Sequence, residues 1–262
     1  MRNTFLIILA LAAMVFVSCE KTNERLAEQL AGKWMVTGTD GKPAPTDVKA
    51  VINFLSATKA ARSMSGAGYE EVIDNWQYEK PCDVTITGKT VTLTDSPAKE
   101  VTVTVDMTIS SITDQGFAAD CKRVVIIGGV KMEPTKSSLQ FSRVSKDYSQ
   151  DILGTWEGRV SSSEGSEHDD GELHRWEYRS DGSYSYYRQD EKGNWVDDVN
   201  VHSEYFCDGT LLCTRWKNPG QPEMRESWEI DSIENGVMKW KALRTREDKT
   251  TYTATFQMTK VK

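Results

Sequence analysis

Several features are scarce in this chain of 262 residues, and each scarcity excludes a class of protein. There are only three histidines and five cysteines, no Cys-x-x-Cys pair occurs, and 32 basic residues face 39 acidic ones. The negative balance argues against nucleic acid and anionic lipid as partners. The few cysteines and histidines form no zinc motif. Because no nucleophile elbow and no distinctive carboxylate pair is present, the sequence supports no enzyme and indicates no cofactor.

The first eighteen residues have the composition of a secretory leader. Arg2 supplies a short positive region, Phe5 to Val17 is nearly unbroken apolar sequence, and Ser18 is a small residue. An apolar run of about thirteen residues is too short to cross a bilayer comfortably. We therefore predict a signal peptide over residues 1–18 and a polar N-terminal tether over residues 19–29.

Cys19 directly follows this leader. A cysteine in that place resembles the lipobox of bacterial lipoproteins, in which the peptidase cuts before the cysteine and its sulfur carries a lipid. Phe16 departs from the usual leucine three positions earlier. The alternative is an ordinary leader cut nearby, which leaves Cys19 as an unmodified thiol. The resemblance implies lipid anchoring at the cell envelope, on the periplasmic or surface face of the outer membrane.

The rest of the chain is a tandem repeat. Gly32-Lys33-Trp34 opens one half and Gly154-Thr155-Trp156 opens the other. The halves close on similar strands, Leu139 to Val144 and Phe256 to Val261. The openings are offset by 122 residues and the endings by 117, an ordinary domain size. We predict one domain over residues 30–146 and a second over residues 150–262.

Both copies read as short strands separated by turn signals, the pattern of an all-β meander. In the second copy, turns at Asp181-Gly182, Asp208-Gly209 and Asn235-Gly236 separate about nine candidate strands. So many strands in one sheet would leave exposed edges unless the sheet closes into an up-and-down barrel. The nine strands are expected at residues 155–160, 173–179, 183–188, 195–199, 203–206, 210–216, 226–233, 237–243 and 251–261.

The first copy is less clear, because Val48, Val51, Ile52 and Leu55 also fit a helical stripe. The repeat favours strands, since Phe54 lies twenty residues after Trp34 just as Trp176 lies twenty residues after Trp156. Residues 52–64 should therefore be the hairpin equivalent to residues 176–188. Strands are expected at residues 52–64 (a hairpin), 83–86, 90–94, 100–107, 109–112, 124–127 and 138–144.

The copies differ in surface chemistry. Residues 27–146 hold 14 basic and 14 acidic side chains, whereas residues 147–262 hold 15 and 23, with six of the eight tryptophans and all three histidines. A division of roles would explain this difference, and so would drift on a solvated face.

The cysteines of the two copies lead to different expectations. Cys82 and Cys121 lie in separate predicted strands, and a disulfide is possible if their Cα atoms come within about 7 Å. Cys207 and Cys213 flank a hairpin turn, and neither a two-residue nor a three-residue turn places their sulfurs opposite each other. We therefore expect this second pair to be reduced.

The Gly-x-Trp triplet on a first strand, with a basic residue on the last, resembles the lipocalin and calycin pattern. The duplication behind a lipobox resembles bacterial lipocalin-like lipoproteins. The resemblance implies two tandem up-and-down lipocalin-like antiparallel β-barrels in an all-β chain. It also implies that Trp34 with Arg143, and Trp156 with Lys260, are structural plugs in which the cation lies over the ring. Lys260 departs from the arginine of the pattern.

Candidate ligand-binding residues lie in the second copy. A three-residue turn at Ser180-Asp181-Gly182 would place Tyr178 opposite Tyr184 and Trp176 opposite Tyr186, whereas a two-residue turn would split them. Alternation adds two rings on later strands, Trp228 and Trp240. The alternative to a binding wall is that these rings simply fill the barrel.

A possible metal cluster is weaker. Glu167-His168-Asp169-Asp170, with Glu172 and His174 nearby, offers oxygen and imidazole ligands but has no recognised metal-loop spacing. We interpret it as a flexible acidic loop and predict no metal site.

These features favour a membrane-anchored lipocalin-like binding protein for a small hydrophobic or sugar ligand at the bacterial envelope, with the second barrel as the binder. The alternative is a structural or protein-interaction module with solid barrels, which displays loops such as Ser161 to Glu172 to a partner. An uncharacterised enzyme is the third hypothesis.

The lipid anchor predicts a simple chemical result. Labelled palmitate should be incorporated into the wild-type chain, and the label should disappear in Cys19→Ala because the acylated sulfur is gone. Processing of the wild type should be sensitive to globomycin. Undiminished labelling of Cys19→Ala would contradict the assignment.

Overall fold

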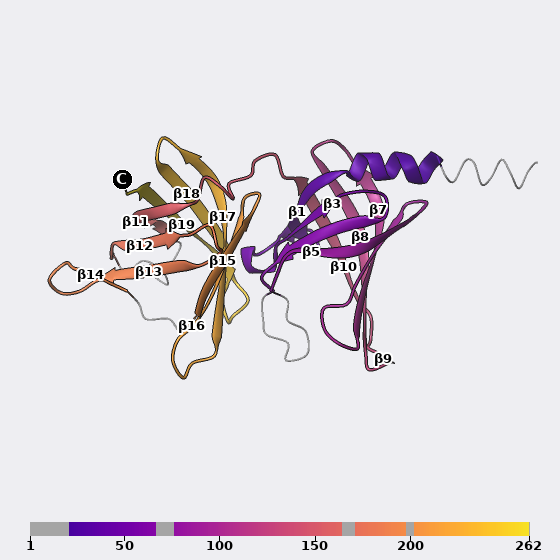
Figure 1. Cartoon of the computed structure of the whole chain (residues 1–262). Helices are drawn as coiled ribbons and strands as arrows, with labels where there is room; N and C mark the ends of the chain where they lie inside the picture. Colours follow the sequence, from indigo (N-terminus) through magenta and orange to yellow (C-terminus); the bar gives the residue numbers. More distant parts are fainter. Residues whose placement is uncertain (1–20, 67–75, 164–170, 198–201, 262) are drawn as a thin grey trace, which may run out of the picture. The chain divides into compact units, whose positions relative to one another are not determined.

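The computed structural model describes residues 21–66, 76–163, 171–197 and 202–261, for residues 161–163 and 202 only as backbone (Figure 1). The predicted signal peptide and Cys19 lie outside these residues. The all-β fold class is confirmed, since almost every element in Figure 1 is a strand of an antiparallel sheet. Within the described residues, no helix is long and apolar enough to cross a membrane.

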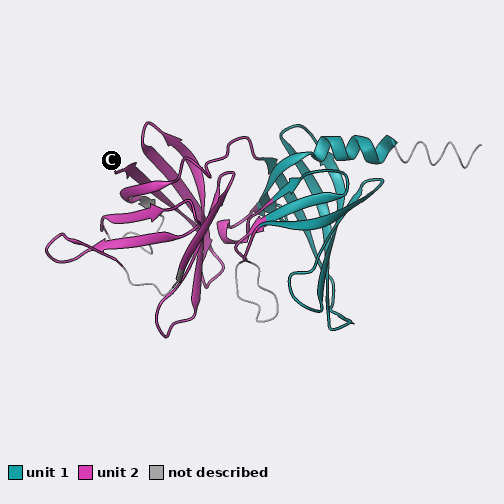
Figure 2. Cartoon of the chain, viewed as in Figure 1, with its two compact units in different colours: residues 1–42, 52–62, 79–143 teal, residues 43–51, 63–78, 144–262 magenta. Residues whose placement is uncertain are grey.

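The chain divides into two compact units, coloured separately in Figure 2. Unit 1 comprises residues 1–42, 52–62 and 79–143, and unit 2 comprises residues 43–51, 63–78 and 144–262. Two short segments that precede residue 144 therefore group with the C-terminal strands.

The first sheet is a closed antiparallel barrel, called here the N-terminal barrel. Its eight strands follow one another around the barrel, and the pairing of β10 with β8 closes the ring. The strands are β1 (Gly32–Thr39), β3 (Ala50–Phe54), β4 (Lys59–Met64), β5 (Gln77–Thr87), β6 (Thr90–Asp95), β7 (Val101–Ile112), β8 (Gly116–Ile127) and β10 (Thr135–Arg143). Short pieces complete it: β2 (Lys42–Pro43), β9 (Val130–Lys131) and the 3₁₀ turn η1 (Thr46–Val48).

Alternation of apolar and polar residues explains these strands. In β6 and β7, valine and leucine alternate with threonine, so that Val91, Leu93 and Val103 are buried while the threonines between them are not. The two segments expected at 100–107 and 109–112 are one strand with a bulge between Ile109 and Ser111.

Residues 21–30 are helical, which differs from the expected polar tether. Leu26 and Leu30 are four residues apart, so they lie on one face of the helix, and both are buried. The Asn23 Oδ1 accepts a hydrogen bond of 2.9 Å from the Gly88 N–H in the β5–β6 turn. The helix therefore packs on the end of the barrel where β1 begins, which we call the closed end.

Trp34 is fully buried at the closed end. Its Nε1 donates to the Leu30 carbonyl at 2.6 Å, and the Arg143 guanidinium lies 4.0 Å from the ring centroid. Arg143 also donates to the carbonyls of Asp114, Ala31 and Gln29 at 2.7, 2.8 and 3.1 Å. Gly32 has φ +103°, and a Cβ there would come within 3.0 Å of the guanidinium, so only glycine fits.

The second copy repeats this arrangement with weaker contacts. The Trp156 Nε1 donates to the Ile152 carbonyl at 2.6 Å, and Gly154 has φ +111°. The Lys260 ammonium lies 5.0 Å from the ring and makes one long hydrogen bond of 3.4 Å, to the Asp151 carbonyl. A compact ammonium cannot reach several carbonyls at once as a planar guanidinium does.

The second sheet, called here the C-terminal sheet, is curled but incompletely closed. Its order is β14-β13-β12-β11-β19-β18-β17-β16-β15. Every predicted strand of this copy is present: β11 (Gly154–Ser163), β12 (His174–Tyr178), β13 (Tyr184–Gln189), β14 (Trp195–Asp197), β15 (His202–Asp208), β16 (Leu211–Lys217), β17 (Glu223–Glu234), β18 (Val237–Thr245) and β19 (Thr251–Lys260).

Within the residues that the structure describes, the two ends of this sheet meet only near the turn of the β12–β13 hairpin. A single bridge joins Ser183 to Glu204, and the Tyr205 N–H donates to the Gly182 carbonyl at 2.8 Å. Beyond the bridge β13 takes β14 as its neighbour instead of β15. We call this incomplete junction between β13 and β15 the seam.

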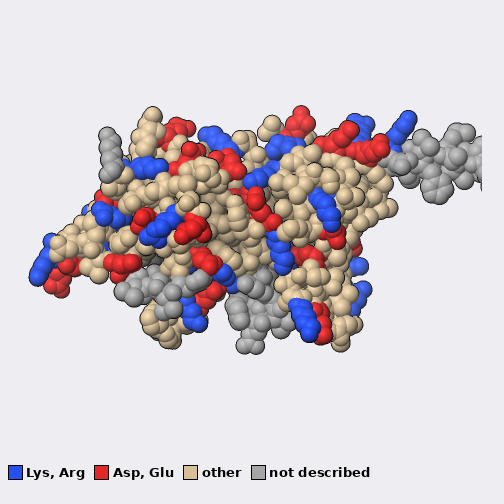
Figure 3. Space-filling model, in the orientation of Figure 1, with Lys and Arg blue, Asp and Glu red and all other residues tan. Residues whose placement is uncertain are grey.

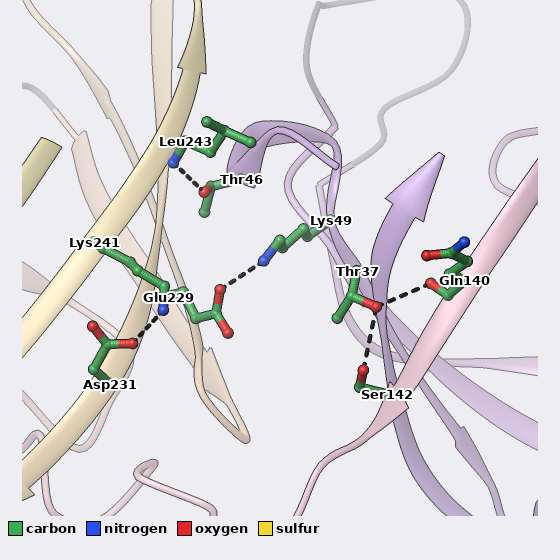
Figure 4. A network of polar contacts seen from close by, with 9 residues as sticks. All are labelled: Thr37, Thr46, Lys49, Gln140, Ser142, Glu229, Asp231, Lys241 and Leu243. Carbon is green, nitrogen blue, oxygen red and sulfur yellow. Dashed lines mark hydrogen bonds and ion pairs between the residues drawn. The ribbon is translucent and has the colours of Figure 1, made fainter. Parts of the chain in front are cut away.

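The outer face of β15 to β18 is buried within unit 2 by residues 43–51, 63–66 and 76–78. The Lys49 ammonium lies 2.6 Å from Glu229, and the Leu243 N–H donates to the Thr46 hydroxyl at 2.8 Å (Figure 4). Trp76 and Tyr78 pack on Phe206, with ring centroids 4.9 and 5.3 Å apart. The buried outward side chains include Phe206, Asp208, Leu211, Cys213 and Ser227.

Unit 1 has its own polar contacts at the junction of β1 with β10. Figure 4 shows the Thr37 hydroxyl, which donates to the Gln140 carbonyl at 3.4 Å and lies 3.3 Å from the Ser142 hydroxyl.

The disulfide considered for Cys82 and Cys121 is not formed. Both are free and buried, with β6 and β7 between their strands. Three strand spacings of about 4.8 Å exceed the Cα separation that a disulfide spans. Cys207 and Cys213 also form no disulfide, as expected, and their backbones pair with Leu212 and Phe206 across a turn at Gly209-Thr210. Burial raises the pKa of Cys121 to about 11 and of Cys213 to about 12.

The unequal plug contacts predict unequal stability effects. Arg143→Ala should lower the free energy of unfolding by about 1–2 kcal/mol, because the ring loses its cation and three carbonyls lose their donor. Lys260→Ala should cost only about 0.5 kcal/mol. Urea unfolding of both variants, compared at equal m-values, measures the difference. Equal effects would contradict the view that arginine holds its end more firmly.

Candidate functional site

The interior of the C-terminal sheet is unusually aromatic. Inward positions of β12, β13, β17, β18 and β19 bring rings together that are far apart in the sequence. The buried cluster contains Trp156, Tyr178, Tyr184, Tyr205, Trp228, Trp240, Tyr252 and Phe256, and Trp176, Tyr186 and Trp216 pack against it while partly exposed.

The β12–β13 hairpin has the register of a three-residue turn. Tyr178 pairs with Tyr184, and Trp176 pairs with Tyr186. Gly182 has φ +82°, the left-handed conformation that closes such a turn and favours glycine. Because of this register, all four rings lie on the inner face of the hairpin.

The six candidate residues form two groups instead of one wall. The first group consists of Trp176, Tyr186, Trp228 and Trp240. The Trp240 ring centroid lies 5.5 Å from that of Trp176 and 5.5 Å from that of Trp228. Trp176 in turn lies 4.9 Å from Tyr186. The second group is Tyr178 with Tyr184, at 6.1 Å.

Three further aromatic residues were missed by sequence reasoning. Phe256 contacts Trp176, Trp228 and Trp240 at 5.3 to 5.9 Å, and so lies among the first group. The His174 ring lies 5.4 Å from Trp176. Tyr205 completes the second group, 4.8 Å from Tyr178. Strand alternation in β12 offered a signal for His174, since it lies on the same face as Trp176 and Tyr178.

Polar pairs accompany the first group. The His174 Nδ1 lies 2.7 Å from the Tyr186 hydroxyl, so one donates to the other according to the imidazole tautomer. The Arg244 guanidinium lies 4.8 Å from the Trp228 ring centroid and donates to Glu226 at 3.1 Å. These pairs orient the rings. They also give the His174 imidazole and the Glu226 carboxylate partners within the protein.

Two of the candidate rings carry a buried donor that has no partner in the described part of the chain. The Trp240 Nε1 and the Tyr178 hydroxyl form no hydrogen bond, although Trp240 is only 2% exposed and Tyr178 equally so. Burial raises the pKa of Tyr178 well above its usual range, so this hydroxyl keeps its proton. A buried donor left unsatisfied costs about 1–3 kcal/mol, and such a group in a native fold calls for an explanation.

Accessibility differs across the first group. Trp228 and Trp240 are buried, whereas Trp176 and Tyr186 are partly exposed. Tyr186 lies on β13, the strand at the seam. The ring faces are largely covered by one another, so a ligand would stack first on the exposed parts of Trp176 and Tyr186.

A separate depression lies on β11 and β19. It is a shallow, open volume of about 480 Å³. Its lining residues are Glu157, Gly158, Arg159, Val160, Leu173, Gln257 and Thr259. None of the six candidate residues lines it.

The predicted absence of a metal site stays a prediction. Glu167, His168, Asp169 and Asp170 lie outside the described residues. Within the described part of the chain, no group of three or more histidine, cysteine, aspartate or glutamate side chains is placed to hold a metal ion.

Comparisons with known proteins give fold likenesses only. No protein-family model matches the chain, and no curated protein matches it. Similar solved structures include a Nitrosomonas europaea protein described as AttH (12% identity, 87% of this chain and 91% of that chain, TM-score 0.27). A Bacteroides fragilis protein described as an outer membrane protein has 12% identity over 90% of this chain and 99% of that chain, with a TM-score of 0.23. A double mutant of transferrin binding protein B from Haemophilus parasuis has 11% identity over 88% of this chain and 60% of that chain, with a TM-score of 0.25. Such values assign neither a family nor an activity.

The unpartnered hydroxyl of Tyr178 predicts an unusual mutational result. Tyr178→Phe should leave the free energy of unfolding unchanged or raise it by up to about 1 kcal/mol, because the variant no longer buries an unsatisfied donor. Tyr205→Phe is the matched control. Its hydroxyl donates to the Arg179 carbonyl at 2.7 Å, so its loss should cost about 1 kcal/mol. Urea unfolding of both variants decides, and a clear loss of stability in Tyr178→Phe would refute the assignment.

Proposed function

We propose that this chain is a lipid-anchored, lipocalin-like binding protein of the bacterial envelope, and that its C-terminal sheet binds a small molecule. The observation that carries the proposal is the unpartnered Trp240 Nε1, which lies within the ring cluster that begins at the seam. Cys19 behind its leader supports the anchor and the outer-membrane location. The proposal assigns binding and no catalysis.

The energetics favour a ligand that supplies a hydrogen-bond acceptor. A carbonyl or ether oxygen that reached the Trp240 Nε1 would recover much of the 1–3 kcal/mol that the unsatisfied donor costs. Aromatic faces add about 0.5–1.5 kcal/mol per well-formed ring contact beyond the area they bury. Both terms reward a flat apolar molecule with few polar groups.

The polar partners in the cluster narrow the ligand class further. The imidazole of His174 pairs with Tyr186, and Glu226 pairs with Arg244, so these groups already have partners. A sugar ring presents many hydroxyls that would need partners at the same time. The cluster therefore favours a hydrophobic ligand with one or two acceptors over a glycan.

The N-terminal barrel lacks comparable features. Its ring of strands is closed, and its interior is largely aliphatic, with residues such as Val91, Val103 and Met107. Its aromatic contacts gather around the plug, where Phe117 lies 5.1 Å from Trp34. This contrast supports the C-terminal sheet as the binder.

A protein-interaction module without a ligand is the second candidate function. The observation that favours it is the burial of Trp228 and Trp240, at 5% and 2% exposure, because rings so well covered can serve as a solid core. This candidate leaves the unpartnered Trp240 Nε1 unexplained.

Tryptophan fluorescence tests the binding site. The soluble chain without residues 1–19 is titrated with planar apolar carbonyl compounds, fatty acids and glycans, and we expect a saturable change with the carbonyl compounds. Trp176→Ala should weaken their binding at least about tenfold, because it removes an accessible stacking face.

Trp195→Ala is the matched control. Trp195 lies on β14, on the outer face of the sheet. The Arg175 guanidinium lies 4.1 Å from the centroid of its ring. Its removal should leave the affinity within about twofold. If no compound of the panel changes the fluorescence of the folded protein, binding is refuted and the interaction module is favoured.

A further inference from the structure

We infer that the closed end of the N-terminal barrel, with the helix of residues 21–30, is the surface that faces the lipid bilayer. The occupant of this surface is the membrane into which the acyl chains of Cys19 insert. The inference rests on the proposed lipidation of Cys19, and it adds an orientation that the anchor alone does not give.

The first step is the length of chain between the anchor and the fold. Only Glu20 separates Cys19 from Lys21, where the described helix residues begin. Two residue steps span at most about 7 Å, even when fully extended. The lipid attachment point is therefore no more than about 7 Å from the start of an ordered element.

The second step is the attachment of that helix to the barrel. Leu26 and Leu30 are buried, and Asn23 accepts a hydrogen bond from the Gly88 N–H. At its other end the helix is held by Arg143, which donates to the carbonyls of Gln29 and Ala31. Because it is held at both ends, the helix is packed on the barrel and is not a flexible linker.

The position of Asn23 sets the distance from the anchor to the β5–β6 turn. Asn23 lies two residues after Lys21, a rise of about 3 Å along a helix. Because the two Cα atoms are also on opposite sides of the helix, they are about 5.5 Å apart. With the step from Cys19, the Asn23 side chain and its hydrogen bond, the anchor lies within roughly 20 Å of Gly88. Lys89 in this turn is exposed, so it should lie near the headgroups.

The opposite end of the barrel is much farther away. Thr90, at the β5–β6 turn, pairs with Thr108, and Thr108 pairs with Asp120, so Asp120 lies level with that turn. Ile127 follows seven residues later on the same strand. Seven strand residues extend about 23 Å. Ile127 pairs with Val130, which is 65% exposed in β9, so Val130 should point away from the bilayer.

Charge does not drive this orientation. The exposed Lys21 and Arg25 are balanced by Glu24 and Glu28 within the same helix. Figure 3 shows basic and acidic side chains interspersed on the face in view, without one continuous basic patch. The short covalent connection and the docked helix are therefore the cause, and the orientation should persist in salt and on neutral lipid.

The test places a fluorophore at either end of the barrel in the full-length lipidated protein. Lys89→Cys and Val130→Cys are each labelled with a maleimide dye, which the four buried native thiols should not take up. The proteins are reconstituted in phosphatidylcholine vesicles that carry a headgroup quencher. We expect quenching at position 89 to exceed that at position 130 at least about threefold, at both low and high salt.

The matched control lengthens the connection without touching the barrel. Insertion of twelve Gly/Ser residues between Glu20 and Lys21 adds a flexible span of about 19 Å and should bring the two quenching values close together. Equal quenching at both positions in the vesicle-bound protein without the insertion would overturn the orientation and leave the anchor intact. Failure of the protein to bind vesicles at all would overturn the proposed anchor, and this surface with it.

Discussion

The contact between a buried tryptophan and a basic side chain closes one end of each sheet, and the rest of the structure depends on it. Trp34 links the N-terminal helix, β1 and β10, because its Nε1 bonds to Leu30 while Arg143 covers its ring. Gly32 permits the close approach of the guanidinium. A ring in this place seals the core from water and fixes where the first and last strands meet. The second copy repeats the glycine and the tryptophan, with Lys260 in place of the arginine.

Local chemistry made the strands of the C-terminal sheet predictable. Its turns at Gly182 and Gly236 and the alternation between them indicated all nine strands, because each signal lies within a few residues of its effect. The first half of β8 was missed because Ala118 and Ala119 carry little strand preference. The buried outer face around Phe206 was also missed, since no local pattern shows that Trp76 and Tyr78 cover it.

The candidate site was predicted in part for the same reason. The hairpin register that joins Trp176 to Tyr186 follows from one turn, so it could be read from the sequence. The contact of Trp240 with Trp176 crosses the sheet interior and depends on how strongly the sheet curls. Neither the placement of Phe256 among these rings nor the unpartnered Trp240 Nε1 has a signal in the sequence, because satisfaction of a donor is a property of the packed interior.

The seam gives a physical reason for the different interiors of the two sheets. In the N-terminal barrel β4 pairs directly with β5, so the ladder is continuous and the core is sealed. In the C-terminal sheet β14 takes the place beside β13. Among the described residues, β15, which pairs with β16 on its other side, has one bridge to β13, between Ser183 and Glu204. An open junction loses ladder hydrogen bonds and exposes part of the core, which is costly unless large side chains cover the opening. Trp176 on β12 and Tyr186 on β13 are partly exposed rings on this side of the sheet, and under the binding proposal they are where a ligand would first make contact.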